Sequence, residues 1–110
     1  MYKVDDKNNI FLTRGDTSVL KLAVTDSDEQ PYDYSNDTVQ LTVKTSTYTN
    51  TVIIQKNITG DSFIIEPLDT ANLEYGKYVY DVQIITSTHN VYTVIAPADF
   101  VICNEVNFNA

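Results

Sequence analysis

Strict alternation of apolar and polar side chains over short segments is the feature that most constrains the fold of this chain. Residues 38–45 place an apolar side chain at every second position, and residues 18–25 and 77–86 repeat the pattern. Successive side chains of a strand point to opposite faces, so each segment predicts a strand with one buried face. The residues expected to face inward are Leu20, Leu22, Val24, Val39, Leu41, Val43, Tyr80, Val82 and Ile84.

Further segments rich in Val, Ile, Thr and aromatic residues, which pack well on a pleated surface, predict an all-β fold. They are residues 9–14, 51–58, 62–68 and 91–103. Residues 69–73 are predicted to form one helical turn, in which the Asp69 side chain caps the first free amides. Proline donates no backbone hydrogen bond, so we expect a bulge or an edge at Pro97. About seven short antiparallel strands in two sheets predict a β-sandwich.

The length of the chain fits one domain. One hundred and ten residues bury enough surface for a single core and rarely form two. We therefore expect one domain over residues 1–110, with the ends at 1–8 and 105–110 as candidates for disorder. The lone Cys103 cannot form an internal disulfide, which fits folding in a reducing compartment.

The charge of the chain argues against several classes of partner. Seven basic against fifteen acidic side chains give a net charge of −8, so the surface repels phosphate backbones and anionic lipids. We expect no nucleic-acid partner. No apolar run is long enough for a membrane span, and the first residues lack the pattern of a signal peptide. The sequence thus predicts a soluble product of the cytoplasm with no membrane partner.

The candidates for chemistry do not form a catalytic or metal site in the sequence, so we expect no enzyme activity, metal or cofactor. Residues 26–37 hold five carboxylates, but Pro31 stands where a calcium-binding EF-hand loop needs glycine, which favours a solvated acidic loop. The only histidine, His89, lies in a predicted turn, and Cys103 is expected to be a buried or half-buried thiol. Residues 14–16 spell the integrin-binding Arg-Gly-Asp tripeptide, which we interpret as a turn.

Four tyrosines are candidates for specific roles. Tyr78 follows Gly76 at the start of the strongest predicted strand, where β-sandwiches often place a corner tyrosine whose hydroxyl bonds to nearby backbone. Tyr32 and Tyr34 in the acidic loop, and Tyr48 in the next turn region, are expected to be exposed. They are the candidate interaction residues, because exposed aromatic rings anchor protein partners or stack on sugars, although packing within the loops would also explain them.

Several segments, taken together in their order and spacing, carry a resemblance that spans nearly the whole chain. The segments are Thr13-Arg14-Gly15-Asp16-Thr17, Leu20-Lys21-Leu22-Ala23-Val24-Thr25-Asp26, Gln30-Pro31-Tyr32-Asp33-Tyr34, Leu73-x-x-Gly76-x-Tyr78-x-Tyr80-Asp81-Val82-Gln83-Ile84, Tyr92-Thr93-Val94 and Phe100-Val101-Ile102. The set resembles the N-terminal module of upper baseplate proteins from phages that infect Gram-positive bacteria. The chain departs from that pattern at Glu29-Gln30 and at Ala98, where such modules often carry glycine.

The resemblance implies an immunoglobulin-like β-sandwich that acts as a structural or attachment module of a phage tail or baseplate, without catalysis. It implies a location in the virion after synthesis in the cytoplasm of the bacterial host. The expected partners are other tail or baseplate proteins, bound through a strand edge or the loops. Self-association stays open. So does the alternative function, a carbohydrate-binding module that recognises a host cell-wall saccharide through Tyr32, Tyr34 and Tyr48.

Overall fold

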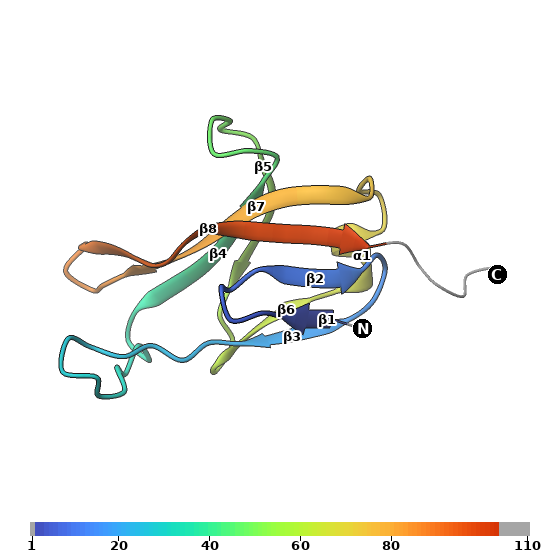
Figure 1. Cartoon of the computed structure of the whole chain (residues 1–110). Helices are drawn as coiled ribbons and strands as arrows, with labels where there is room; N and C mark the ends of the chain where they lie inside the picture. Colours follow the sequence, from blue (N-terminus) through green and yellow to red (C-terminus); the bar gives the residue numbers. More distant parts are fainter. Residues whose placement is uncertain (1, 104–110) are drawn as a thin grey trace.

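A computed structural model describes residues 2–103 as a β-sandwich of two sheets (Figure 1). The larger sheet has six strands in the order β1-β2-β8-β7-β4-β5, and the smaller sheet pairs β3 with β6. The elements are β1 (Tyr2–Val4), β2 (Ile10–Thr13), β3 (Ser18–Lys21), β4 (Thr38–Lys44), β5 (Val52–Asn57), β6 (Ser62–Ile65), α1 (Pro67–Thr70), β7 (Gly76–Ile85) and β8 (Val91–Cys103). The predicted all-β sandwich is confirmed.

The core lies between the two sheets and follows the predicted alternation. Of the residues expected inward, all are buried except Val24, which is half-buried and packs against the same core. Ile10, Leu12, Phe63, Phe100 and Ile102 complete the buried layer. Burial of apolar side chains on one face of each strand is what holds the sheets together, because removing that surface from water is the main favourable term in folding.

Part of the strand order corresponds to that of immunoglobulin domains. β8, β7, β4 and β5 take the places of strands G, F, C and C′ of a variable-type domain, and β3 and β6 take those of B and E, while β1 and β2 stand beside β8 in the larger sheet. One pairing departs from the prediction of antiparallel strands only, since β2 runs parallel to β8 from Ile10↔Phe100 to Thr13↔Cys103. Alternation within a segment specifies its faces but not the direction of its neighbour.

The N-terminal segment is ordered into a strand that the sequence prediction missed. Tyr2–Val4 pair with β2, so a strand lies within the segment 1–8 that the sequence marks as a candidate for disorder. The Asp5 carboxylate closes the following turn by accepting the backbone N–H groups of Lys7 and Asn9, both at 2.9 Å. The hydrogen bond from the Asn9 backbone is the main reason why the pKa of Asp5 is lowered. Residues 105–110 lie outside the described part of the chain.

The corner before β7 is closed by the predicted tyrosine. The Tyr78 hydroxyl donates a 2.9 Å hydrogen bond to the Glu74 carbonyl, which confirms the corner. The helical turn lies earlier than predicted, over α1 (Pro67–Thr70). Asp69 is not its first cap but its third helical residue, and its Oδ2 accepts the backbone N–H of Glu66 at 2.7 Å. Proline favours the first helical position, which places the start of the helix at Pro67.

Pro97 sits in a bulge, as predicted. Tyr80 pairs with Ala98 and Val82 pairs with Ile95, so Asp81 on β7 faces two residues of β8. Two residues opposite one define a β-bulge. On the hairpin side of the bulge, residues 91–95 of β8 pair with residues 82–85 of β7. This hairpin extends past Ile10, where β2 begins (Figure 1).

Candidate interaction surface

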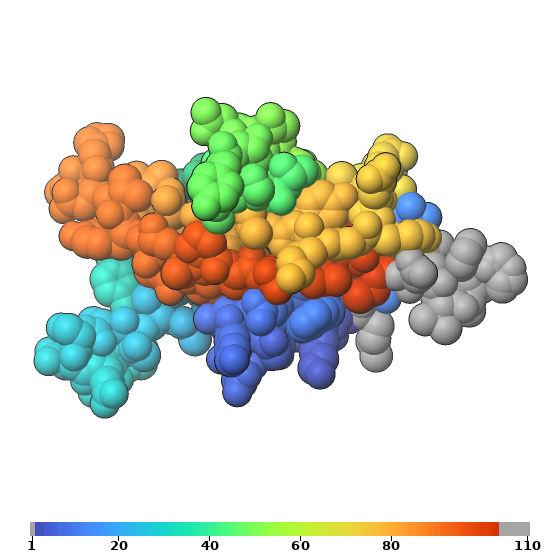
Figure 2. All heavy atoms as spheres, turned by 45° about the horizontal axis from the view of Figure 1, so that its top comes forward, coloured from blue at the N-terminus to red at the C-terminus, as the bar shows by residue number. Residues whose placement is uncertain are grey.

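One end of the sandwich gathers the loops that carry tyrosine and carboxylate side chains. Residues 26–37, which join β3 to β4, and the tip of the β7–β8 hairpin extend toward the same end in both views (Figures 1 and 2). Variable immunoglobulin domains use the corresponding B–C and F–G loops for recognition. Tyrosine, serine and asparagine, which dominate such recognition loops, are frequent here as well.

Tyr32 lies in the acidic loop at this end. Its side chain is 37% exposed, and its hydroxyl donates a 2.7 Å hydrogen bond to Oδ2 of Asp37. That hydrogen bond is the main cause of a raised pKa of Tyr32, and the nearby hydroxyl of Tyr92 contributes. The ring is therefore held in one orientation while part of its surface stays open to a partner.

Tyr92 is the residue that the sequence interpretation missed. It stands on β8, 55% exposed, beside Val91, which is 56% exposed. Tyr92 also contributes to the raised pKa of Tyr32, after the hydrogen bond to Asp37, burial and the Asp37 charge. The sequence signal that could have found it is the pair of large apolar residues, Val91 and Tyr92, directly after the Thr88-His89-Asn90 turn. Adjacent strand residues point to opposite faces, and a half-buried strand usually has only one apolar face.

Tyr34 serves the fold more than the surface. Its ring is half-buried against the core, and its hydroxyl donates a 2.8 Å hydrogen bond to the Leu22 carbonyl. Burial raises the pKa of Tyr34. Together with Tyr32 it lines a hollow of about 350 Å³ between the acidic loop and the Gly60-Asp61 turn. The structure thus joins these two candidates in one place but gives Tyr34 mainly a packing role.

Tyr48 lies elsewhere. It is 97% exposed on the loop of residues 45–51 between β4 and β5, which stands at a distance from residues 26–37 in both views (Figure 2). The three tyrosines proposed from the sequence therefore do not form one aromatic surface.

The carboxylates of the acidic loop shape its backbone. Oδ1 of Asp26 accepts the N–H groups of Asp28 and Gln30, and Oδ1 of Asp33 accepts the N–H of Ser35, which lowers the pKa of Asp33. Asp and Asn side chains commonly bond to the backbone two residues on in turns. Within residues 2–103, no three His, Cys, Asp or Glu side chains gather in a way that could hold a metal ion.

The remaining sequence candidates have structural positions. Gly15 turns the chain with a φ of 83°, and the Arg14 guanidinium stacks 4.2 Å from the centre of the Tyr75 ring, so the Arg-Gly-Asp segment is a turn whose arginine is engaged in packing. His89 adopts a φ of 68° in its turn and is exposed. Cys103 is a half-buried free thiol at the end of β8. The turn and thiol predictions are confirmed.

The outer edge of β8 is open along the segment that carries Tyr92. β2 pairs with β8 only from Phe100 onward, so within the described chain the segment 91–98 has a ladder partner on the β7 side alone. An unpaired strand edge presents backbone N–H and C=O groups that another chain can bind.

No helix in the described part of the chain is long and apolar enough to cross a membrane. Comparison of the chain with protein-family models, with curated proteins and with solved structures found no match.

Proposed function

We propose that this chain is a structural module of a phage tail or baseplate, located in the virion, that acts by binding other proteins of that assembly. The ordered segments that resemble the N-terminal module of upper baseplate proteins support this proposal. The immunoglobulin-like order of the strands agrees with the fold that the resemblance implies. We propose no catalytic activity for it.

The observation that carries the protein-binding role is the open β8 edge over residues 91–98, which carries the exposed Tyr92 and lies at the same end of the sandwich as the loop of Tyr32. An extended segment of a partner can add to residues 91–98 through main-chain hydrogen bonds, while exposed aromatic rings supply contact area at small entropic cost. Neighbouring strands lie about 4.8 Å apart, so an added strand would lie directly beside the part of β8 that carries Tyr92.

The charge of this end selects the partner surface. The segment 22–43 contains Asp26, Asp28, Glu29, Asp33 and Asp37 but no Lys or Arg. Acidic loops attract basic surfaces and accelerate the encounter, and salt screens the attraction over about 10 Å at ordinary ionic strength. The expected partner segment is therefore extended and basic.

Pull-down and calorimetric binding against the tail and baseplate proteins encoded beside this gene test the proposal. We expect one of them to bind the chain, with affinity that falls as the salt concentration rises. The double variant Tyr32→Ala/Tyr92→Ala should weaken binding at least tenfold, since exposed aromatic anchors dominate such interfaces. The matched control is Tyr48→Ala, which removes an exposed tyrosine on a different loop.

Two results would contradict the proposal. If none of these tail proteins binds, the chain has another role. If Tyr48→Ala weakens binding as much as the double variant, the binding surface is not the open β8 edge.

A further inference from the structure

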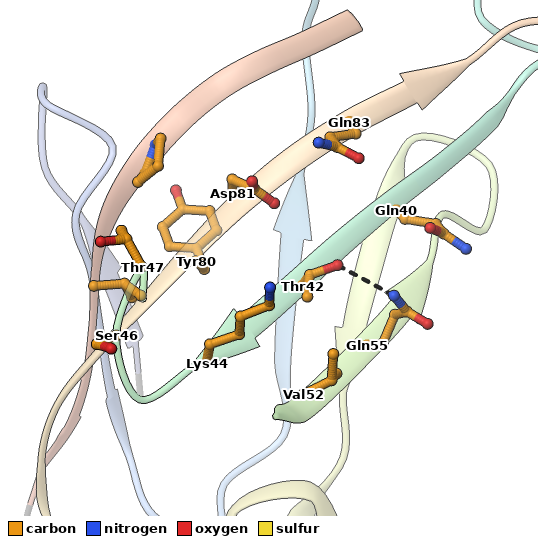
Figure 3. Close-up of a pocket in the computed structure, with 12 residues that line it drawn as sticks. Gln40, Thr42, Lys44, Ser46, Thr47, Val52, Gln55, Tyr80, Asp81 and Gln83 are labelled. Atoms are coloured by element: carbon orange, nitrogen blue, oxygen red, sulfur yellow. Dashed lines mark hydrogen bonds between the residues drawn. The ribbon is translucent and has the colours of Figure 1, made fainter. Parts of the chain in front are cut away.

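The outer face of the larger sheet carries a groove that the proposed protein contacts do not use. It has a volume of about 320 Å³ and lies across β4, β5 and β7, with residues of the 45–51 loop along one side (Figure 3). This volume is at the lower end of the range for small-ligand pockets, roughly 300–1,000 Å³. The groove is separate from the hollow beside Tyr32 and Tyr34, because the two share no lining residue.

Amide and hydroxyl side chains line the groove. Gln40, Gln55 and Gln83 line it from three neighbouring strands, and Thr42 lies among them (Figure 3). The Gln83 amide also donates a 3.5 Å hydrogen bond to the Thr93 hydroxyl on β8 and keeps its oxygen available. Gln55 donates a 3.3 Å hydrogen bond to the Thr42 hydroxyl, so these groups are within reach of one another. A side-chain amide both donates and accepts. The same is true of a sugar hydroxyl, which makes rows of amides suited to a ligand rich in hydroxyl groups.

The charges in the groove balance. It contains one ammonium group, Lys44, and one carboxylate, Asp81. A phosphate or a carboxylate ligand would meet no net positive charge there, on a protein of net charge −8. The lining therefore favours a neutral ligand.

Apolar patches interrupt the polar row. Val52, Val79 and Pro97 also line the groove, and the fully exposed ring of Tyr48 stands on the loop whose Ser46 and Thr47 form its wall. Sugar rings present C–H faces as well as hydroxyl groups, and aromatic and aliphatic side chains pack against those faces.

From this lining we infer that the groove binds a neutral oligosaccharide. The hydroxyl groups of the ligand bond to Gln40, Gln55 and Gln83, and Tyr48, which follows the lining residue Thr47 in the sequence, is the candidate to cover one sugar ring. This inference goes beyond the proposed protein-binding function and uses a different face of the sandwich. Of the tyrosines considered from the sequence for sugar recognition, it retains Tyr48 and leaves Tyr32 and Tyr34 to the other surface.

Titration of the ¹⁵N-labelled protein with cellohexaose, chitohexaose, maltohexaose and xylohexaose tests the inference. We expect at least one of these neutral sugars to shift the amide signals of β4, β5 and β7 at millimolar concentration. The double variant Gln40→Ala/Gln83→Ala should weaken that binding about tenfold or more, because each lost hydrogen bond contributes to affinity. Tyr48→Ala should weaken it as well.

The control variant is Tyr32→Ala/Tyr92→Ala, which should bind sugar as the unaltered protein does. The inference is overturned if none of the sugars shifts any signal, or if the shifts map to residues 26–37 and 86–92. It is also overturned if a tail protein, rather than a sugar, shifts the groove signals. Because the glutamine variant keeps Tyr32 and Tyr92, loss of sugar binding with retained protein binding separates this inference from the proposed function.

Discussion

The tyrosines of this chain differ in function according to where each hydroxyl is directed. Tyr78 bonds to the Glu74 carbonyl and closes a corner, whereas Tyr80 is buried in the core and its hydroxyl donates to the Asn8 carbonyl. Tyr32 bonds to a carboxylate at the surface. One residue type thus supplies a corner, a core contact and a candidate binding contact. The neighbouring backbone decides which role each residue has.

Replacing Tyr78 by phenylalanine removes only the corner hydrogen bond. We expect the free energy of unfolding to fall by about 1 kcal/mol, the usual net contribution of one hydrogen bond, because the half-buried ring keeps its packing. Urea denaturation followed by circular dichroism measures the change. Tyr48→Phe is the control, since that side chain is almost fully exposed. Identical unfolding midpoints for Tyr78→Phe and the unaltered protein would exclude a stabilising corner.

The raised pKa of Tyr80 predicts how the free energy of unfolding changes at alkaline pH. Burial, with a smaller effect from the Asp5 charge, raises its pKa to about 12 from the ordinary tyrosine value of 10.0. Between these values the unfolded chain has lost a proton that the folded chain still holds, so stability is complete below pH 10 and falls as the pH rises toward 12. Denaturation at a series of pH values should show this fall.

The variant Tyr80→Phe should flatten this alkaline slope. Part of the slope should remain, because the pKa values of Tyr32 and Tyr34 are raised as well. A slope as steep as that of the unaltered protein would mean that Tyr80 does not hold its proton in the folded state.

At the scale of elements, the sequence predicted the strands whose alternation is long. β4 buries every second residue, and so does β7 from Tyr80 onward, which is the pattern of a strand with one face in the core. β1 was missed because its three residues are all exposed and leave no alternation to detect. α1 was placed too late because Asp69 suits the third position of a helical turn as well as the first.

The candidate site was only partly predictable for a related reason. Exposed tyrosines can be found in loops, but their neighbours depend on which loops meet at one end of the sandwich. The loop of Tyr32 and the hairpin that carries Tyr92, sixty positions away, extend toward the same end, whereas Tyr48 stands apart. The parallel pairing of β2 with β8 leaves the hairpin edge open. Strand order is a property of the assembled sheets and is absent from any one segment.

Substitutions on the inward face of β4 should lower the free energy of unfolding far more than substitutions on the outer face of β3. Leu41 is 1% exposed in the centre of the core, so Leu41→Ala should cost roughly 2–5 kcal/mol of stability through lost burial and the cavity left behind. Val19 faces outward on β3, and Val19→Ala should cost less than about 1 kcal/mol. Denaturant midpoints measure both. Equal losses would mean that β4 does not pack as described.

At the scale of the whole molecule, net charge acts on folding and on binding in opposite directions. A net charge of −8 makes the folded chain repel itself, and salt screens that repulsion. We therefore expect the melting temperature at neutral pH to rise with sodium chloride concentration, while affinity for a basic partner falls. Calorimetric melting at low and high salt checks the first trend. A melting temperature that falls with salt would show that attractive ion pairs, such as Lys56 with Asp69, dominate instead.

β1 and β2 lie beside the end of β8. The chain can therefore be rejoined and cut at new positions without changing how the strands are arranged in the sandwich. Tyr2 lies opposite Leu12, and Leu12 lies opposite Ile102, so residues 2 and 102 are two strand spacings apart, about 10 Å. A linker of a few glycine and serine residues could span that gap, and the loop of residues 45–51 offers an exposed place to cut. A circularly permuted chain that starts within this loop should fold to the same sandwich, with an unchanged circular dichroism spectrum and a lower unfolding midpoint.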